Sequence, residues 1–111
     1  MVILRNMKYV IISTTIDTAV KADKLADLII KNRLAACAQI MPIKSIYRWK
    51  GKVERAREFL LFLKTKTSLK SRLIKFIRRS HPYEVPEIAV LNIVDGLNDY
   101  LKWIDMETGN K

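Results

Sequence analysis

Residues 81–87, with the sequence HPYEVPE, constrain this chain more than any other stretch. They include the only histidine and two of the three prolines, at positions 82 and 86. Proline fixes its own φ angle, donates no backbone hydrogen bond and pushes the preceding residue toward extended geometry. The segment is therefore predicted to be a stiff, non-helical connector between a basic helix and an apolar strand, and it holds His81 and Glu87 in place.

Upstream of this connector, the spacing of apolar residues predicts a strand and then a helix. Residues 9–12 are apolar and largely β-branched, which is typical of a buried strand. Residues 18–32 predict an amphipathic helix, with Asp17 positioned to cap it by accepting from a first-turn amide. One apolar stripe predicts that the helix packs on a sheet, and it consists of Ala22, Leu25, Ala26 and Ile29.

A long hairpin is predicted next. Residues 34–49 have the character of a strand that Pro42 interrupts, and because proline cannot donate to a central ladder, this strand is expected to lie at an edge or to bulge there. Lys50 and Gly51 predict a two-residue turn. The returning strand ends in residues 59–63, which are apolar on both faces and indicate a central position in the sheet.

The remaining patterns complete an α+β fold. We expect a second helix at residues 69–79 capped by residue 67 or 68, a fourth strand at 88–94 and a short last helix from about Asn98. The order β-α-β-β-α-β plus a C-terminal helix matches the ferredoxin-like plan with an antiparallel sheet. The length fits one domain covering residues 1–111.

In this topology the second and fourth strands form the two edges of the sheet. Edge strands expose unpaired backbone groups that a protein must cover or blunt. The second strand is long and has only Pro42 and a few basic side chains to blunt it. Pairing of edges between subunits in a closed ring is therefore expected.

The positive charge of the chain is concentrated in a basic band. The net charge is +10, and residues 44–79 contain thirteen Lys and Arg against two Glu. Such a band attracts nucleic acid, anionic metabolites or a membrane surface, although a solvated face that keeps the protein soluble is the simpler interpretation. Nucleic acid is disfavoured because the sequence has only three glycines, no phosphate-cradling loop and no recognised nucleic-acid motif.

The cysteine count and the apolar runs bear on location. A single cysteine, Cys37, excludes an intrachain disulfide and fits a reducing cytoplasm. Residues 1–4 are too short for the apolar core of a signal peptide, and no run approaches the roughly 20 apolar residues of a membrane span. The expected location is cytoplasmic, without membrane contact.

Three side chains are competent metal ligands: the Cys37 thiolate, the His81 imidazole and the Glu87 carboxylate. A thiolate with an imidazole suits copper or zinc. Their spacing alone is weak evidence, because no paired-cysteine or paired-histidine motif is present. The alternative is structural: Cys37 as a small strand residue, His81 hydrogen-bonded to the backbone and Glu87 facing water.

Catalysis has less support. No residue is marked to orient a Cys37 and His81 pair, and no oxyanion loop is visible. Glu84 and Glu87 are three residues apart on an extended segment, so they are expected to point to opposite faces. The chain is therefore predicted not to be an enzyme.

Five sequence blocks occur in a fixed order along the chain. They are LAACA at 34–38, SIYRWKGKVE at 45–54, LKT at 63–65, HPYEVPE at 81–87 and DYLKWI at 99–104. On these blocks the chain resembles the CutA divalent-cation-tolerance family from Tyr9 to about Asp105.

This resemblance implies a ferredoxin-like subunit in a homotrimer built by pairing strand edges, similar in plan to PII-type signalling trimers. It also implies tolerance to divalent cations, notably copper, and Cys37, His81 and Glu87 are similar to the proposed metal contacts of the family. Within one subunit these three should lie far apart. We therefore expect any shared site in a cleft between subunits.

Two departures from the family pattern matter. Ser13 stands where some members have a second cysteine, and the acidic run that commonly follows the hairpin is replaced by residues 54–58, with the sequence ERARE. A two-thiolate site is therefore not expected. The basic band is peculiar to this chain.

The first expectation is thus a trimeric, non-enzymatic, cytoplasmic tolerance protein that binds a divalent cation, with copper as the first candidate. One alternative is a PII-like regulatory trimer that binds an anionic small molecule on the basic band, or a partner protein. Another is a nucleic-acid binder that uses Arg72, Lys75, Arg78 and Arg79.

Overall fold

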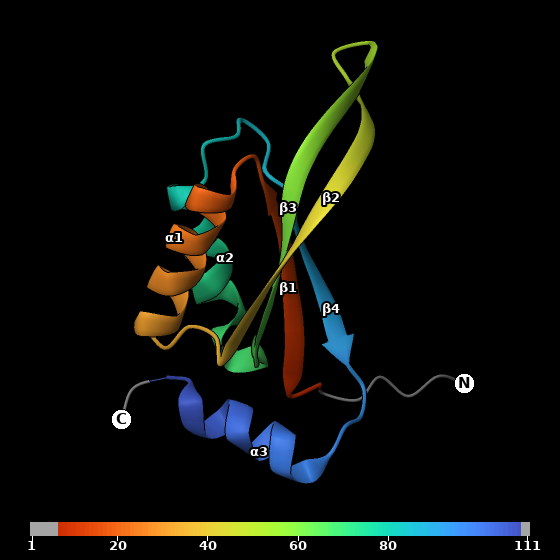
Figure 1. Ribbon diagram of the computed structural model, residues 1–111. Helices are drawn as coiled ribbons and strands as arrows, with labels where there is room; N and C mark the ends of the chain where they lie inside the picture. Colours follow the sequence, from red (N-terminus) through yellow and green to blue (C-terminus); the bar gives the residue numbers. More distant parts are fainter. Residues whose placement is uncertain (1–6, 110–111) are drawn as a thin grey trace, which may run out of the picture.

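The computed structural model describes residues 7–109, so residues 1–4, considered above as a signal segment, lie outside the described part. Four strands form one antiparallel sheet in the order β2-β3-β1-β4 (Figure 1). The strands are β1 (Tyr9–Ile16), β2 (Cys37–Trp49), β3 (Lys52–Lys66) and β4 (Ile88–Ile93). β2 and β4 are the two edges, as predicted.

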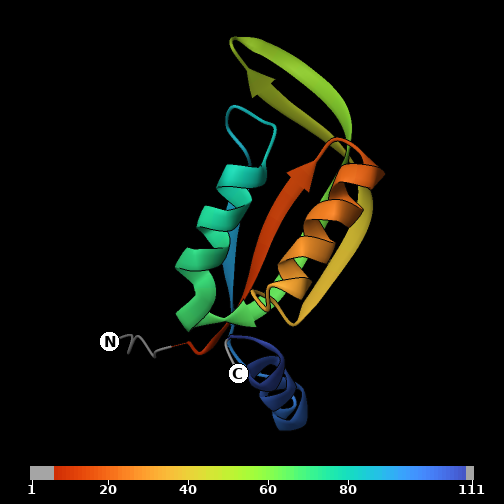
Figure 2. The same ribbon diagram turned by 90° about the vertical axis from the view of Figure 1, so that its left-hand side faces the viewer.

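The helices lie in two places. Figure 2 shows α1 and α2 side by side over one face of the sheet, and Figure 1 shows α3 across one end of it. Their bounds are α1 (Ala19–Lys31), α2 (Lys70–Ser80), which follows the short 3-10 turn η1 (Thr67–Leu69), and α3 (Asn98–Glu107). The ferredoxin-like α+β fold with an extra C-terminal helix is confirmed.

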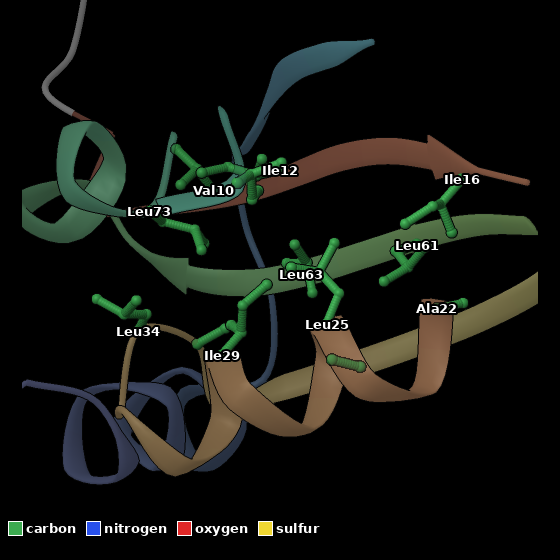
Figure 3. Close-up of a cluster of buried hydrophobic side chains, with 13 residues drawn as sticks. Val10, Ile12, Ile16, Ala22, Leu25, Ile29, Leu34, Leu61, Leu63 and Leu73 are labelled. Carbon is green, nitrogen blue, oxygen red and sulfur yellow. The ribbon is translucent and has the colours of Figure 1, made fainter. Parts of the chain in front are cut away.

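The core lies between the sheet and the α1–α2 layer (Figure 3). Successive strand residues face opposite sides, so alternate side chains of β1 and β3 point at the helices. Ile12 of β1 is directly opposite Leu63 of β3, and both are fully buried. They pack in one cluster with Leu25 and Ile29, which belong to the predicted stripe of α1.

The caps of the first two helices differ from the prediction. α1 begins at Ala19, so its cap is Thr18, whose side chain accepts from the backbone N–H of Lys21 at 3.2 Å. Asp17 was expected in that role and instead forms an ion pair with the Lys21 ammonium at 3.2 Å. At α2 the chain enters through the 3-10 turn, and no side chain caps the helix.

The long hairpin is continuous. β2 and β3 keep one register from Cys37, opposite Lys64, to Trp49, opposite Lys52. Pro42 therefore lies in an unbroken edge strand. Of the two predicted alternatives, the edge position is confirmed, and the interruption or bulge does not occur. The predicted turn is formed with φ values of 49° at Lys50 and 79° at Gly51, the positive angles of a type I′ turn.

Half of this hairpin projects beyond the rest of the sheet (Figure 1). The pairing of β1 with β3 stops at Phe59, whereas β2 and β3 remain paired up to the turn. Residues 43–58 therefore form a two-stranded ribbon, an arrangement that is marginal in water without further packing. The ribbon also exposes apolar side chains, with Ile46 57% and Val53 60% exposed.

Candidate functional site

The connector at residues 81–87 runs from the end of α2 to the start of β4. α2 ends at Ser80, and His81 has the extended backbone angles φ −86° and ψ 134° that a following proline favours. Along its course the connector contacts β1 and β3 through the side chains of His81, Tyr83 and Glu87. The prediction of a non-helical connector at this point is confirmed.

His81 is fixed by the backbone on both sides of its ring. It is 9% exposed, and its Nε2 lies 2.6 Å from the carbonyl oxygen of Thr15 on β1. Since a carbonyl only accepts, Nε2 is the donor, and Nδ1 accepts from the backbone N–H of Tyr83 at 3.2 Å. This is the pattern of a neutral imidazole, and it corresponds to the structural alternative given above for His81.

Tyr83 ties the connector to the base of the projecting ribbon. Its hydroxyl donates to Glu58 Oε2 at 2.8 Å, and its ring meets the His81 ring edge-on at 4.6 Å between centroids. Burial of the phenol, followed by its hydrogen bond to Glu58, raises the pKa of Tyr83 far above its ordinary value. The phenol therefore remains a hydrogen-bond donor at neutral pH.

Glu58 is a site residue that sequence reasoning missed. It is only 7% exposed and lies on β3, where the ribbon leaves the sheet. The only local signal was its position next to the apolar run at 59–63. Its burial is unusual, because charged side chains are seldom buried without a partner.

Glu87 lies at the other end of the connector. Its side chain is exposed, and Ser13 on β1 donates to its Oε2 at 3.4 Å, which is a long hydrogen bond. Ser13 was considered above only as the replacement for a cysteine. The structure now shows it as the neighbour of Glu87.

The connector, the ribbon and the end of β1 enclose one pocket of about 710 Å³. Its lining combines aromatic side chains with three carboxylates. The residues are Thr15, Ser45, Ile46, Tyr47, Trp49, Glu58, Tyr83, Glu84, Val85 and Glu87. Two of the carboxylates, Glu84 and Glu87, were expected to point to opposite faces and instead line the same pocket.

Cys37 lies elsewhere, at the start of the β2 edge. It is opposite Lys64 of β3 and lines a separate groove together with side chains of α1 and Trp103 of α3. β3 and β1 separate β2 from β4, so within one subunit Cys37 is remote from the connector, as predicted. Among residues 7–109, no three His, Cys, Asp or Glu side chains are grouped so as to hold a metal ion. A joint site between subunits stays a prediction.

No helix within residues 7–109 has the length and apolar character needed to cross a membrane.

Comparisons with a family model and with individual proteins point to the same family. Residues 10–107 match the family described as CutA1 divalent ion tolerance protein. The divalent-cation tolerance protein CutA of Thermus thermophilus is 39% identical over 100 residues, which cover 89% of this chain and 97% of that protein. The chloroplastic protein CutA of Arabidopsis thaliana is 38% identical over 107 residues, which cover 96% of this chain and 59% of that protein.

Solved structures agree with the fold. CutA from Synechococcus elongatus superposes with a TM-score of 0.90 at 31% identity, covering 96% of this chain and 95% of that chain. The chain spans only about half the length of the plant and animal relatives that it matches.

Proposed function

The chain belongs to the CutA1 divalent ion tolerance family, and on that premise we propose that it is a trimeric, cytoplasmic protein that binds a divalent cation between subunits. The proposed ligands are Cys37, His81 and Glu87, with copper as the first metal to test. His81 would bind the metal through Nδ1, in place of the hydrogen bond that this nitrogen accepts from the backbone N–H of Tyr83. The protein acts by binding and not as an enzyme. One observation supports a binding role: His81 Nε2 donates to the carbonyl of Thr15, and a metal-binding imidazole usually makes such a hydrogen bond with its second ring nitrogen.

The two sheet edges support the trimer. Cys37 begins the edge strand β2, and Glu87 immediately precedes the other edge strand, β4. Joining the two kinds of edge between neighbouring subunits would bring these residues together and leave no edge exposed. The projecting ribbon, with its exposed apolar side chains, gains the packing that a two-stranded hairpin lacks alone.

Light scattering tests the assembly. We expect a molar mass of about three times the 12.9 kDa of one chain. An Ile46→Glu replacement on the ribbon should lower the mass, because it places a carboxylate in the proposed apolar contact. Lys44→Glu introduces the same side chain two residues away at an exposed polar position, and it should leave the mass unchanged. A monomeric mass for the unaltered protein would contradict the trimer.

Calorimetric titration with Cu²⁺, and in parallel with Zn²⁺, tests the metal site. Cys37→Ser should weaken binding by about tenfold or more, since a hydroxyl is a much poorer ligand than a thiolate for these ions. Met41→Leu removes the other sulfur of β2 and serves as the matched control with unchanged binding. Equal affinity in the Cys37→Ser variant and the unaltered protein would exclude Cys37 from the site.

The cytoplasmic location is part of the proposal and rests on the single cysteine, which fits a reducing compartment.

A further inference from the structure

The outer side of α2 carries a row of cations that the proposed metal site does not use. α2 buries Leu73 and Ile77 in the core. On the opposite side of the helix lie Arg72, Lys75 and Arg79, all exposed, at positions i, i+3 and i+7. That spacing places the three cations on one line along the helix, roughly 10 Å long. These three residues are called the α2 row below.

The α2 row has no counterion in the described part of the chain. Within residues 7–109, none of its side chains forms an ion pair. The sequence has no Asp or Glu between Glu58 and Glu84. The neighbouring helix α1 differs, because it mixes acidic and basic residues, and two of its lysines pair with aspartates four residues before them. The positive charge is therefore confined to a face one helix wide.

The alignment of the row costs the helix stability. Like charges three and four residues apart repel each other on a helix surface. Arg72 also lies in the first turn, where the positive end of the helix dipole disfavours a cation, and no acidic residue or side-chain cap offsets it there. A face that serves solubility alone needs no such alignment, as the mixed charges of α1 show. A bound row of anions would relieve both costs.

The α2 row remains accessible in the proposed trimer. The proposed contacts between subunits use the sheet edges β2 and β4 and the projecting ribbon. α2 instead covers one face of the sheet beside α1 (Figure 2), and the row lies on the side of α2 that faces away from the sheet. Joining edges extends the sheet sideways, so it leaves the outer side of the helix layer uncovered.

The form of the row distinguishes between anionic partners. α2 contributes no large exposed hydrophobic side chain, so it has nothing to insert into a membrane and no exposed ring to stack on nucleic-acid bases. Arg78 lies beside the row, which gives at most four cations, fewer than the about six to ten phosphate contacts of a strong nucleic-acid binder.

An acidic helix matches the row better. Carboxylates at positions i, i+3 and i+7 of a second helix have the same spacing, so each meets one cation, as charged residues do between paired helices. Two of the three cations are arginines, whose guanidinium groups bind carboxylates through two parallel hydrogen bonds.

From these observations we propose that α2 is a docking surface for an acidic helical segment of another protein, in which Arg72, Lys75 and Arg79 each pair with one carboxylate. The inference goes beyond the proposed metal function and shares no residue with it. Exposed ion pairs are individually weak and are screened by salt, so docking is reversible and weakens as the salt concentration rises.

Fluorescence anisotropy on the full chain at low salt tests the inference. The probe is a labelled alanine-based peptide of about 18 residues with glutamates on one face at the spacing of the row. It should bind more tightly than a peptide of the same composition whose glutamates are spread around the helix. Arg72→Glu combined with Arg79→Glu should weaken binding by about tenfold or more. The same double variant should bind a peptide with lysines in place of the glutamates, which also shows that it is folded.

Lys24→Glu combined with Lys31→Glu is the matched control. It lowers the net charge by the same amount, at exposed positions of the neighbouring helix. It should change the affinity by no more than about twofold, because these charges lie outside the row. The Arg72 and Arg79 double variant should keep the molar mass of the unaltered protein, and a lower mass would overturn the inference by placing α2 in the contact between subunits.

Equal affinities for the two glutamate peptides, or equal losses in the two double variants, would also overturn the inference. So would tighter binding of a DNA duplex, or of vesicles that contain phosphatidylserine, than of the acidic peptide, and the row would then serve nucleic acid or a membrane. The metal proposal is judged separately, because the Cys37→Ser variant should bind the acidic peptide as the unaltered protein does.

Discussion

Replacing Leu63 with alanine is expected to lower the free energy of unfolding by about 3 kcal/mol, through lost burial and the cavity left behind. Leu63 is 0% exposed and sits on the central strand β3. Its strand neighbours are Ile12 on one side and Ala38 on the other, and α1 covers it from the helix layer (Figure 3). With partners on all sides, the site has little freedom to collapse around a smaller side chain.

Urea unfolding at one fixed protein concentration measures this loss, since assembly makes stability depend on concentration. Leu91→Ala is the matched control, because Leu91 lies on the edge strand β4 and is 46% exposed. It should cost less than about 1 kcal/mol. Similar losses for the two variants would mean that the core is not centred on β3.

Replacing His81 with alanine is expected to lower the free energy of unfolding by about 3 kcal/mol as well, for a different reason. The ring satisfies two backbone groups, the carbonyl of Thr15 and the N–H of Tyr83, in a position that is 9% exposed. Each buried group left without a partner costs about 1–3 kcal/mol. Urea unfolding of the variant measures the sum.

His81→Gln is the informative companion variant. Its amide group can donate to the Thr15 carbonyl but offers nothing at the position of Nδ1, so it should recover about half of the lost stability. A loss below about 1 kcal/mol in the alanine variant would show that the two hydrogen bonds are not important for folding. His81→Ala is a poor test of the proposed metal site, because weaker copper binding in this variant could come from the damaged fold as well as from the lost ligand. Cys37→Ser is therefore the cleaner test.

Much of the fold could be predicted because its signals are local. The apolar stripe of α1, the two-residue turn at Lys50 and Gly51, and the apolar run of β3 each depend on residues close together in the chain, and all three were predicted correctly. The predicted cap of α1 was wrong by one residue. Asp17 and Thr18 are both able to cap a helix, and the residue at which the helix begins decides between them. Pro42 was expected either to lie in an edge strand or to bulge it; the edge position is confirmed, and an edge strand tolerates proline without a break.

The features of the candidate site also fall into two groups: those that the sequence predicts and those that depend on tertiary packing. The sequence by itself determined that residues 81–87 form a stiff connector, that β2 and β4 are edges and that Cys37 is remote from His81 and Glu87, because proline geometry and strand order follow from the chain. Only the tertiary structure decided that His81 bonds to a carbonyl 66 residues away and that Tyr83 meets Glu58 across 25 residues. Such partners are set by how the helix layer, the connector and the ribbon pack together, and no pattern of neighbouring residues encodes them.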